Sequence, residues 1–257
     1  MALPAIAAAD PPSSRWRAVL RLAELLILLL VMVPPHLVAK LGGRRSRWPR
    51  RFLRQAAHII GVRATVEGAL LTPPTLAIAN HVSWLDILIL GGATGTAFVS
   101  KADVATAPLV GWLADQNHTL YVERADRGDA LGQVRRIAEG IERNQPLTIF
   151  PEGTTGNGRA LLPFRPTLLA AVAPAAPGTK VRPVAIDYGA AATGIAWHGG
   201  ESGIDNALRL LGRSGTLPVI VRLLDPLPPG EDRKTMAREA QARIATALAF
   251  PRPSAGL

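Results

Sequence analysis

The sequence contains no cysteine among its 257 residues, and it has only five histidines. Disulfide bonds, thiolate nucleophiles and metal sites with cysteine ligands are therefore excluded. Charged residues are also scarce, at 19%, whereas hydrophobic residues reach 48%, which excludes disorder as the main state of the chain. This length and composition predict one large domain with a sizeable buried core.

Acidic residues are scarcer than basic ones, with 19 Asp and Glu against 29 Lys and Arg, so the formal net charge is +10. Such an excess favours anionic partners, namely anionic lipid, nucleic acid or a phosphate-bearing substrate. The sequence has no recognition-helix, RNA-binding-sheet or zinc-finger signature, and we therefore expect no nucleic acid. A non-enzymatic basic protein that binds a membrane or nucleic acid is the alternative from a different functional class.

One long apolar stretch lies near the N-terminus, from Ala18 to Val33, and it includes Arg21 and Glu24. A full membrane span needs roughly 20 apolar residues. The stretch therefore predicts either a tilted span or a helix that lies in the membrane interface. A signal peptide fits poorly, because the region before the stretch carries Asp10 and no small-x-small cleavage site follows it.

Six arginines follow the apolar stretch within eleven residues, interleaved with Trp48 and Phe52. Guanidinium groups and aromatic rings beside a hydrophobic segment suit the headgroup layer of an anionic membrane. A solvated basic helix face is the alternative. The six are Arg44, Arg45, Arg47, Arg50, Arg51 and Arg54.

From about residue 62, short β-rich runs alternate with helical stretches, which predicts a single α/β domain with a mostly parallel or mixed sheet flanked by helices. In such sheets the active site collects just beyond the carboxyl ends of the strands. The predicted strands are 62–66, 75–79, 96–100, 119–123, 146–150, 181–187 and 217–223, and the predicted helices are 84–90, 128–143 and 231–249.

The first strand-end motif places His81 where a strand passes into a helix, with Asp86 one helical turn further. A carboxylate in that position can hold one ring nitrogen and stabilise the imidazolium, which leaves the other nitrogen free to take a proton. Ser83 and Asp86 also match a capping box, with Ser83 as the N-cap. Asp86 is therefore predicted either to orient a catalytic base or only to cap the helix.

Lys101 and Arg124 each follow a predicted strand in the same way. An arginine at a strand end suits bidentate phosphate binding. The alternatives are a salt bridge from Arg124 to Glu123 or Asp126, and a solvated turn lysine at Lys101.

A glycine-rich loop follows the strand predicted at 146–150. Gly153 and Gly158 have the spacing of a phosphate-binding loop, but Arg159 and Ala160 replace its lysine and hydroxyl residue, so an NTPase is excluded. The loop still offers N–H groups, hydroxyls and the Glu152 carboxylate to a polar or anionic headgroup. The sequence contains no Gly-x-Ser-x-Gly elbow and no zinc-binding His-Glu pattern.

In their order and spacing these motifs resemble the glycerolipid (lysophosphatidate-type) acyltransferase family. The resemblance implies a membrane-associated O-acyltransferase that moves a fatty acyl group from acyl-CoA or acyl-carrier protein to the hydroxyl of a lysolipid, without a cofactor, a metal or a covalent intermediate. The matching motifs are Asn80-His81-x4-Asp86, Tyr121-Val122-Glu123-Arg124, Phe150-Pro151-Glu152-Gly153-Thr154 and Val181-Arg182-Pro183-Val184-Ala185-Ile186.

The resemblance also implies residue roles. His81 would be the general base on the lysolipid hydroxyl, oriented by Asp86, and Arg124 would bind the acceptor phosphate. The acceptor headgroup would be positioned by residues of the glycine-rich loop, and Lys101 is a further candidate for substrate binding. The loop residues with this implied role are Glu152, Gly153 and Thr154.

The expected acceptor is 1-acyl-glycerol-3-phosphate, with phosphatidate as the product. The family commonly has arginine where this chain has Thr155, and this loop together with residues 98–101 looks closer to a bacterial branch that acylates lyso-ornithine lipid, which has no phosphate. Lyso-ornithine lipid is therefore the alternative acceptor, and Arg159 or Arg165 could supply the missing charge if the acceptor is a phosphate.

The domain prediction places a tail, the hydrophobic segment and the basic juxtamembrane helix in residues 1–60, and the catalytic domain in 61–257. The arginines after the apolar stretch favour the cytoplasmic side of the inner membrane for the catalytic domain.

Overall fold

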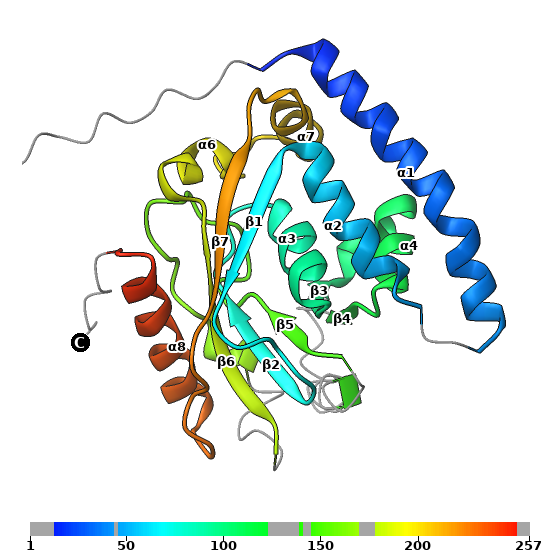
Figure 1. Ribbon diagram of the computed structural model, residues 1–257. Coiled ribbons are helices and arrows are strands. Elements are labelled where there is room, and N and C mark those ends of the chain that lie inside the picture. The colour runs from blue at the N-terminus through cyan, green and yellow to red at the C-terminus, as the bar shows by residue number, and fades with distance from the viewer. Residues whose placement is uncertain (1–12, 44–45, 123–138, 141–144, 170–177, 251–257) are drawn as a thin grey trace, which may run out of the picture.

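The computed structural model describes residues 13–43, 46–122, 139–140, 145–169 and 178–250. They form an α/β domain in which helices cover both faces of a seven-stranded sheet (Figure 1). The strand order is β1-β7-β6-β2-β5-β3-β4, and all neighbours run parallel except the antiparallel pair β6–β7. The predicted mostly parallel or mixed sheet is therefore confirmed.

All seven predicted strands are present, and each end lies within one residue of its predicted position. These stretches are recognisable because short β-branched and aliphatic runs stop at polar residues or glycine. The strands are β1 (Val62–Glu67), β2 (Thr75–Ala79), β3 (Ala97–Lys101), β4 (Leu120–Val122), β5 (Leu147–Ile149), β6 (Lys180–Asp187) and β7 (Leu217–Leu223).

The helices predicted at 84–90 and 231–249 are confirmed as α3 and α8. Most of the helix predicted at 128–143 lies outside the described residues. The helices are α1 (Arg15–Leu41), α2 (Trp48–Ile60), α3 (Leu85–Thr94), α4 (Pro108–Gln116), α6 (Ala192–Ile195), α7 (Gly203–Gly212) and α8 (Arg233–Ala247).

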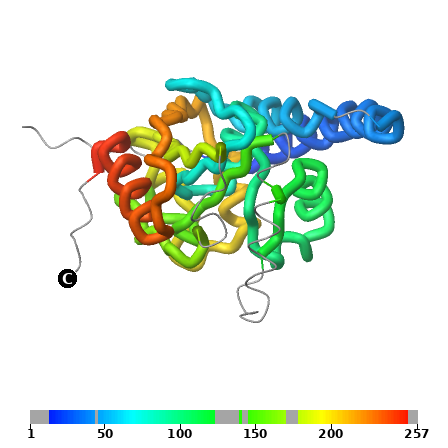
Figure 2. Tube along the Cα trace, turned by 90° about the horizontal axis from the view of Figure 1, so that it is seen from below, coloured from blue at the N-terminus to red at the C-terminus, as the bar shows by residue number. Residues whose placement is uncertain are grey.

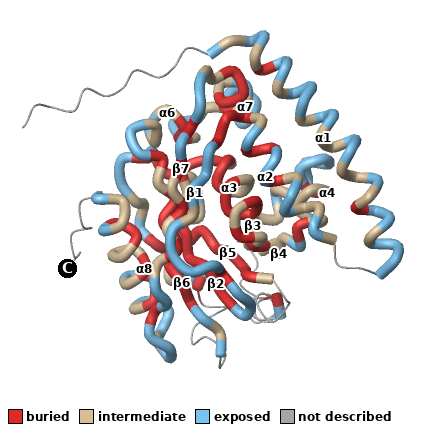
Figure 3. Tube along the Cα trace, in the orientation of Figure 1, coloured by how far each residue is buried: buried red, intermediate tan, exposed pale blue. Residues whose placement is uncertain are grey.

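Strand β2 lies near the middle of the sheet and is buried along its whole length, as the red strands of Figure 3 show. Its side chains alternate between two apolar layers, because successive residues of a strand point to opposite faces. Ala77 and Ala79 pack with α2, α3 and α7, whereas Leu76 and Ile78 pack with α8. The carboxyl end of β2 is thus held from both sides.

Helix α2 packs closely against α3 because α3 carries two glycines at the contact. A side-chain carbon at Gly92 would stand 2.7 Å from the backbone of Arg54, and one at Gly91 would stand 2.5 Å from the Leu53 side chain. The buried face of α2 therefore belongs to the core, while Arg51 and Arg54 are exposed and Arg50 donates to the carbonyl groups of Gly92 and Ala93 in α3.

Helix α1 runs along the outside of the domain beside α2 (Figures 1 and 2). By length and composition it could cross a membrane. One face is nevertheless attached to the domain: Arg17 and Arg21 donate to the carbonyl groups of Leu211, Gly212 and Arg213 at the end of α7. Near its other end His36 is buried, with Nε2 at 3.0 Å from Gln116 Oε1 of α4.

Candidate active site

Three adjacent strands bring the candidate residues to one edge of the sheet. His81 follows β2, Glu152 follows β5 and Tyr188 follows β6. Because β6, β2 and β5 are parallel neighbours, their carboxyl ends meet at the same edge. This is the edge at which α/β proteins place their ligands.

His81 and Asp86 form a hydrogen-bonded pair, with Nδ1 at 2.8 Å from Oδ2. The Asp86 side chain is wholly buried, whereas that of His81 is 19% exposed. A carboxylate oxygen can only accept, so Nδ1 carries the hydrogen and Nε2 of the neutral ring keeps its lone pair. Among the described residues Nε2 has no hydrogen-bond partner, so it is available to a substrate hydroxyl.

Asp86 also organises the start of α3. Its Oδ2 accepts from the N–H groups of Val82 (2.7 Å) and Ser83 (3.0 Å), and its Oδ1 accepts from the Tyr188 hydroxyl (2.5 Å). The two predicted roles of Asp86, capping and orienting, are therefore both compatible with the structure.

The contacts of the predicted capping box are present. Asp86 Oδ2 accepts from the N–H of Ser83 at 3.0 Å, and Ser83 Oγ lies 3.4 Å from the N–H of Leu85. Trp84 stands directly before α3, but its φ of −60° and ψ of −19° already lie in the helical region, so the chain enters the helix directly after Ser83.

Aromatic stacking fixes the plane of the imidazole. The His81 ring lies on Phe150 with centroids 4.2 Å apart and an interplanar angle of 20°, and Phe150 lies nearly parallel to Phe98. Asn80 ties the end of β2 to β6 through hydrogen bonds in both directions with the backbone of Ile186. The imidazole of His81 is therefore held by its ring face, its Nδ1 and its preceding residue.

Glu152 lies beneath the main chain of His81. Its Oε1 accepts from the N–H of His81 at 2.7 Å, and its Oε2 accepts from the N–H of Leu162 at 2.9 Å. Burial raises the pKa of Glu152 to about 7, against the effect of these two N–H groups. Contact between this carboxylate and the acceptor headgroup stays a prediction, since the structure shows both oxygens bound to the backbone.

The rest of the loop is more open. Gly153 is half-buried with a φ of +70°, Thr154 is exposed, and Thr155 donates to the carbonyl of Trp197 at 2.5 Å. Gly156 donates to the carbonyl of His81 at 2.7 Å. The loop is thus fixed to the main chain of His81, while Thr154 faces solvent.

The remaining two predicted residues lie away from this cluster or outside the described chain. Lys101 ends β3, two strands from β2 in the sheet, which corresponds to about 10 Å. Arg124 lies outside the described residues. Within the described ranges, no group of three or more His, Cys, Asp or Glu residues could hold a metal ion.

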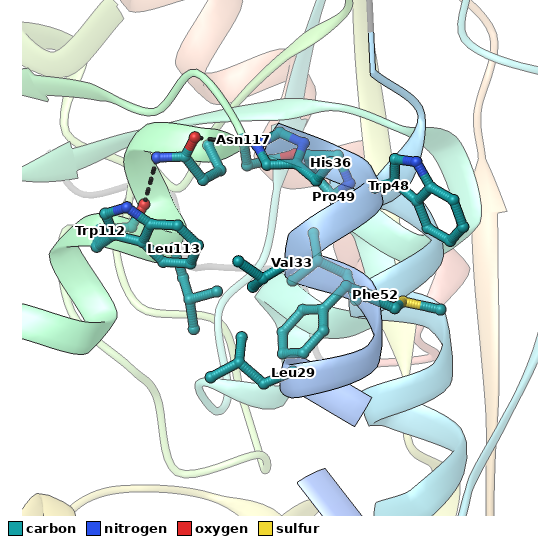
Figure 4. A pocket seen from close by; sticks show the side chains of 12 residues that line it. Leu29, Val33, His36, Trp48, Pro49, Phe52, Trp112, Leu113 and Asn117 are labelled. Carbon is teal, nitrogen blue, oxygen red and sulfur yellow. Dashed lines mark hydrogen bonds between the residues drawn. The ribbon is translucent and has the colours of Figure 1, made fainter. Parts of the chain in front are cut away.

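A separate pocket lies between α1, α2 and α4 (Figure 4). Its walls are mainly apolar, with His36, Gln116 and Asn117 as polar members. It contains none of the candidate catalytic residues. The apolar walls include Leu29, Val33, Phe52, Trp112 and Leu113.

Tyr188 is the residue of this cluster that the sequence analysis missed. It is the first residue after β6, and its side chain is buried against Asp86. The signal that selected His81, a polar group directly after a strand, would also have selected Tyr188.

Known proteins share this sequence pattern and fold. The family model described as Acyltransferase matches residues 53–187. A lyso-ornithine lipid O-acyltransferase from Pseudomonas aeruginosa is 36% identical over 252 residues, which cover 91% of this chain and 95% of that protein. A 1-acyl-sn-glycerol-3-phosphate acyltransferase from Neisseria meningitidis is 34% identical over 113 residues, or 44% of each chain.

A crystal structure of the 1-acyl-sn-glycerophosphate acyltransferase PlsC from Thermotoga maritima has a similar fold. The TM-score is 0.59 at 20% identity, and the match covers 91% of this chain and all of that one. The family model and the full-length relatives show that this chain belongs to the acyltransferase family and is an acyltransferase enzyme.

Proposed function

We propose that this enzyme transfers a fatty acyl group from an acyl thioester, acyl-CoA or acyl-carrier protein, to the hydroxyl of lyso-ornithine lipid at a membrane surface. The observation that carries the proposal is the His81–Asp86 pair, in which Nδ1 is fixed at 2.8 Å from a buried carboxylate and Nε2 is open. An open imidazole nitrogen of this kind suits general-base chemistry on a hydroxyl.

In this mechanism His81 Nε2 takes the proton of the acceptor hydroxyl as that oxygen attacks the thioester carbonyl. The tetrahedral intermediate then collapses, the carbon–sulfur bond breaks, and the leaving thiolate receives the proton from Nε2. Asp86 holds Nδ1 and stabilises the imidazolium between the two transfers. The acyl group passes directly to the acceptor, and His81 ends the cycle neutral.

Two observations support lyso-ornithine lipid as the acceptor. The relatives matched over nearly their full length carry that activity in their names, at 36% identity for Pseudomonas aeruginosa and 32% for Brucella abortus. Thr155, whose hydroxyl donates to the carbonyl of Trp197, stands at the loop position where the family resemblance implies an arginine. An acceptor without phosphate has no need of that cation.

Lysophosphatidate is the second candidate acceptor. Arg159 and Arg165 are both exposed, and the N–H of Arg165 donates to the carbonyl of Pro151 at 2.9 Å, directly before Glu152. The named 1-acyl-sn-glycerol-3-phosphate acyltransferases match a shorter part of the chain. Either arginine could bind a phosphate group at the edge of the loop.

An acyl-transfer assay on the purified full chain separates these acceptors. Palmitoyl-CoA and palmitoyl-carrier protein would each be offered with lyso-ornithine lipid or with lysophosphatidate, beside His81→Ala. We expect product from lyso-ornithine lipid at a rate at least about 10-fold above that from lysophosphatidate, and none above background from the variant. Product from lysophosphatidate alone would overturn the acceptor, and a fully active variant would overturn the base.

The apolar helix and the lipid-modifying relatives indicate membrane association. We further propose that α1 lies flat in the interface, with the catalytic domain on the cytoplasmic face of the inner membrane. The helix has 27 residues, about 40 Å, and it is attached to the domain near both ends through Arg21 and His36. Its outward face is apolar and exposed, with Ile27 at 60%, Leu30 at 65% and Val31 at 65%.

Because the chain contains no cysteine, single cysteines can report the position of each end of α1. Trp16→Cys and Leu41→Cys would be treated with a membrane-impermeant maleimide in spheroplasts and in inverted vesicles. A flat helix makes both sites reactive in inverted vesicles only. Reaction of the two sites from opposite sides would show a membrane span instead.

A further inference from the structure

Tyr188 is a buried titratable group to which the mechanism above gives no task. It follows β6 directly, is 4% exposed, and places its hydroxyl 2.5 Å from Asp86 Oδ1. Burial and the adjacent Asp86 carboxylate raise the pKa of Tyr188 well above its usual value. The hydroxyl therefore stays protonated, and remains a donor, at every pH at which the enzyme would be assayed.

The donors around Asp86 are divided unevenly between its two oxygens. Oδ2 accepts from the His81 ring and from the N–H groups of Val82 and Ser83, whereas Oδ1 accepts from Tyr188. In the described part of the chain, Tyr188 donates the single hydrogen bond that Asp86 Oδ1 accepts. Without that hydroxyl, one oxygen of a wholly buried carboxylate would lose its partner, and the carboxylate plane would lose its second fixed point.

We propose that Tyr188 is a positioning residue for acyl transfer, and that its hydroxyl acts through Asp86 on the orientation and basicity of His81. This inference rests on the proposed function, because it needs His81 to be the base. Tyr188 does not touch the substrate in this scheme: the proton moves from the acceptor hydroxyl to His81 Nε2 and then to the leaving thiolate, while the Tyr188 proton stays in place.

Removal of the Tyr188 hydroxyl should shift the pH dependence of turnover in one direction. The Tyr188 hydroxyl draws negative charge toward Oδ1 and away from the imidazole. Without it the carboxylate attracts the protonated imidazole more strongly, so His81 is protonated up to a higher pH. The acid limb of the pH–rate profile should therefore shift to higher pH. The Asp86 carboxylate would also be held less firmly, which should lower kcat while leaving the acceptor KM unchanged.

The other charged groups near the His81–Asp86 pair have the same effect in wild type and in Tyr188→Phe. Glu152 faces the His81 main chain from the loop after β5, and Asp187 precedes Tyr188 and pairs with Arg222 of β7. These groups and their contacts are the same in wild type and in Tyr188→Phe. A difference between wild type and Tyr188→Phe therefore reports the lost hydroxyl.

The chain offers a matched control, because it has two tyrosines and both donate to an aspartate. Tyr121 lies on β4 and its hydroxyl is 2.8 Å from Asp115 Oδ1 at the end of α4. Tyr121→Phe also removes a hydrogen bond from a tyrosine hydroxyl to an aspartate, but at a site that does not contact His81 or Asp86. Its acid limb should stay where the wild-type limb lies.

The experiment measures kcat, acceptor KM and kcat/KM from pH 5 to 9 for the full chain and both variants, with thermal melts alongside. For Tyr188→Phe we expect kcat to fall about 10-fold, KM to stay within about 2-fold, and the acid limb to rise by roughly half a pH unit or more. Wild-type kcat and an unshifted limb in a folded Tyr188→Phe would overturn the inference. A loss of activity that only follows the unfolded fraction would overturn it too.

If Tyr188→Phe does not fold, 3-fluorotyrosine in the Tyr121→Phe background modifies Tyr188 alone. Fluorination makes the phenol a stronger donor, so the acid limb should move downward, and no movement would contradict the proposal. His81→Ala distinguishes a wrong assignment of the base from a wrong role for Tyr188. An active His81→Ala would overturn the proposed base itself, whereas an inactive one with an unshifted Tyr188→Phe would overturn only the role of Tyr188.

Discussion

The carboxyl edge of the sheet and the N-terminal helix α1 meet opposite physical requirements. At the sheet edge Asp86 and Glu152 are almost completely buried, and every oxygen of both carboxylates accepts a hydrogen bond. On α1 most of the outward side chains are apolar and exposed, with Val38 at 69%. Catalysis needs polar groups that cannot move, whereas membrane contact needs apolar surface that no other part of the protein covers.

Each region also depends on a few groups of the other kind. The imidazole of His81 is held in place by an apolar ring, Phe150, and α1 is held on the domain by the polar side chains Arg17, Arg21 and His36. The function of a region is therefore better read from what its groups contact than from its average polarity. Variants confined to one region should show whether catalysis and membrane binding can be disabled separately.

The largest effect should come from His81→Ala. Removing the base should lower kcat on the order of 10³-fold, because general-base catalysis commonly contributes 10²–10⁴-fold. The melting temperature should fall modestly, because the variant also loses the Nδ1 hydrogen bond to Asp86 and the stacking on Phe150, while liposome binding should not change. Steady-state kinetics and a circular-dichroism melt give both values.

His58→Ala is the control for this variant, because His58 is exposed on α2. It should keep wild-type turnover. A His81→Ala enzyme with wild-type turnover and a wild-type melt would show that catalysis lies elsewhere.

Asp86→Asn should come second, and it should affect activity and stability together. Asparagine can no longer accept from all four donors, so the imidazole loses its fixed tautomer and one buried donor loses its partner. We expect kcat to fall about 10²-fold and the free energy of unfolding to fall by about 1–3 kcal/mol. Steady-state kinetics measures the change in kcat, and urea denaturation measures the change in the free energy of unfolding.

Asp232→Ala is the capping control, because Asp232 caps α8 by accepting from the N–H groups of Lys234 and Thr235, and alanine cannot replace that acceptor. Its loss should lower stability alone. If Asp86→Asn behaved in the same way, capping would be the whole task of Asp86.

The third prediction concerns the apolar face of α1. The double variant Leu30→Glu and Val31→Glu places two charges where side chains are 65% exposed. Binding to vesicles of anionic lipid should weaken by about 10-fold or more, while turnover on substrate dissolved in detergent should stay near the wild-type value. Flotation with liposomes measures the first value.

Leu70→Glu is the control, since Leu70 is 62% exposed but lies between β1 and β2 rather than on α1. It should float like wild type. Equal flotation of the α1 variant would mean that another surface binds the membrane.

The strands and the contact between His81 and Asp86 could be predicted from the sequence because both leave local signals. Seven aliphatic runs with polar ends mark the strands, and His81 and Asp86 are five residues apart. Tyr188 lies 102 residues from Asp86, so its contact with that carboxylate exists only in the folded chain. No spacing rule connects such distant positions.

The sequence also does not predict the direction in which a side chain points. Glu152 stands in a glycine-rich loop, where a carboxylate is ordinarily solvated, and the structure turns it inward under His81. Arg21 interrupts the apolar stretch for a reason that only the fold shows, since its carbonyl partners lie 190 and 192 residues away. Local patterns therefore predict elements, but they do not predict which side of an element carries the polar contacts.

The smallest expected effect is a pH dependence of stability that originates at the sheet edge. Burial raises the pKa of Glu152 from 4.5 to about 7, so between these values the folded state binds more protons than the unfolded state. The stability from this group is complete below pH 4.5 and is lost as the pH rises through about 7. Between pH 5 and pH 8 this loss amounts to about 2 kcal/mol. Glu152→Gln should show no such loss in urea denaturation at the two pH values.

Glu201→Gln is the matched comparison. The Arg209 guanidinium lowers the pKa of Glu201 to about 2, so Glu201 stays charged throughout this range. Its variant should keep the wild-type slope between pH 5 and pH 8, whereas the slope should become flatter in Glu152→Gln alone. Equal slopes in wild type and Glu152→Gln would mean that Glu152 is ionised at pH 5. In that case the two N–H groups, rather than burial, would dominate the electrostatics beneath His81.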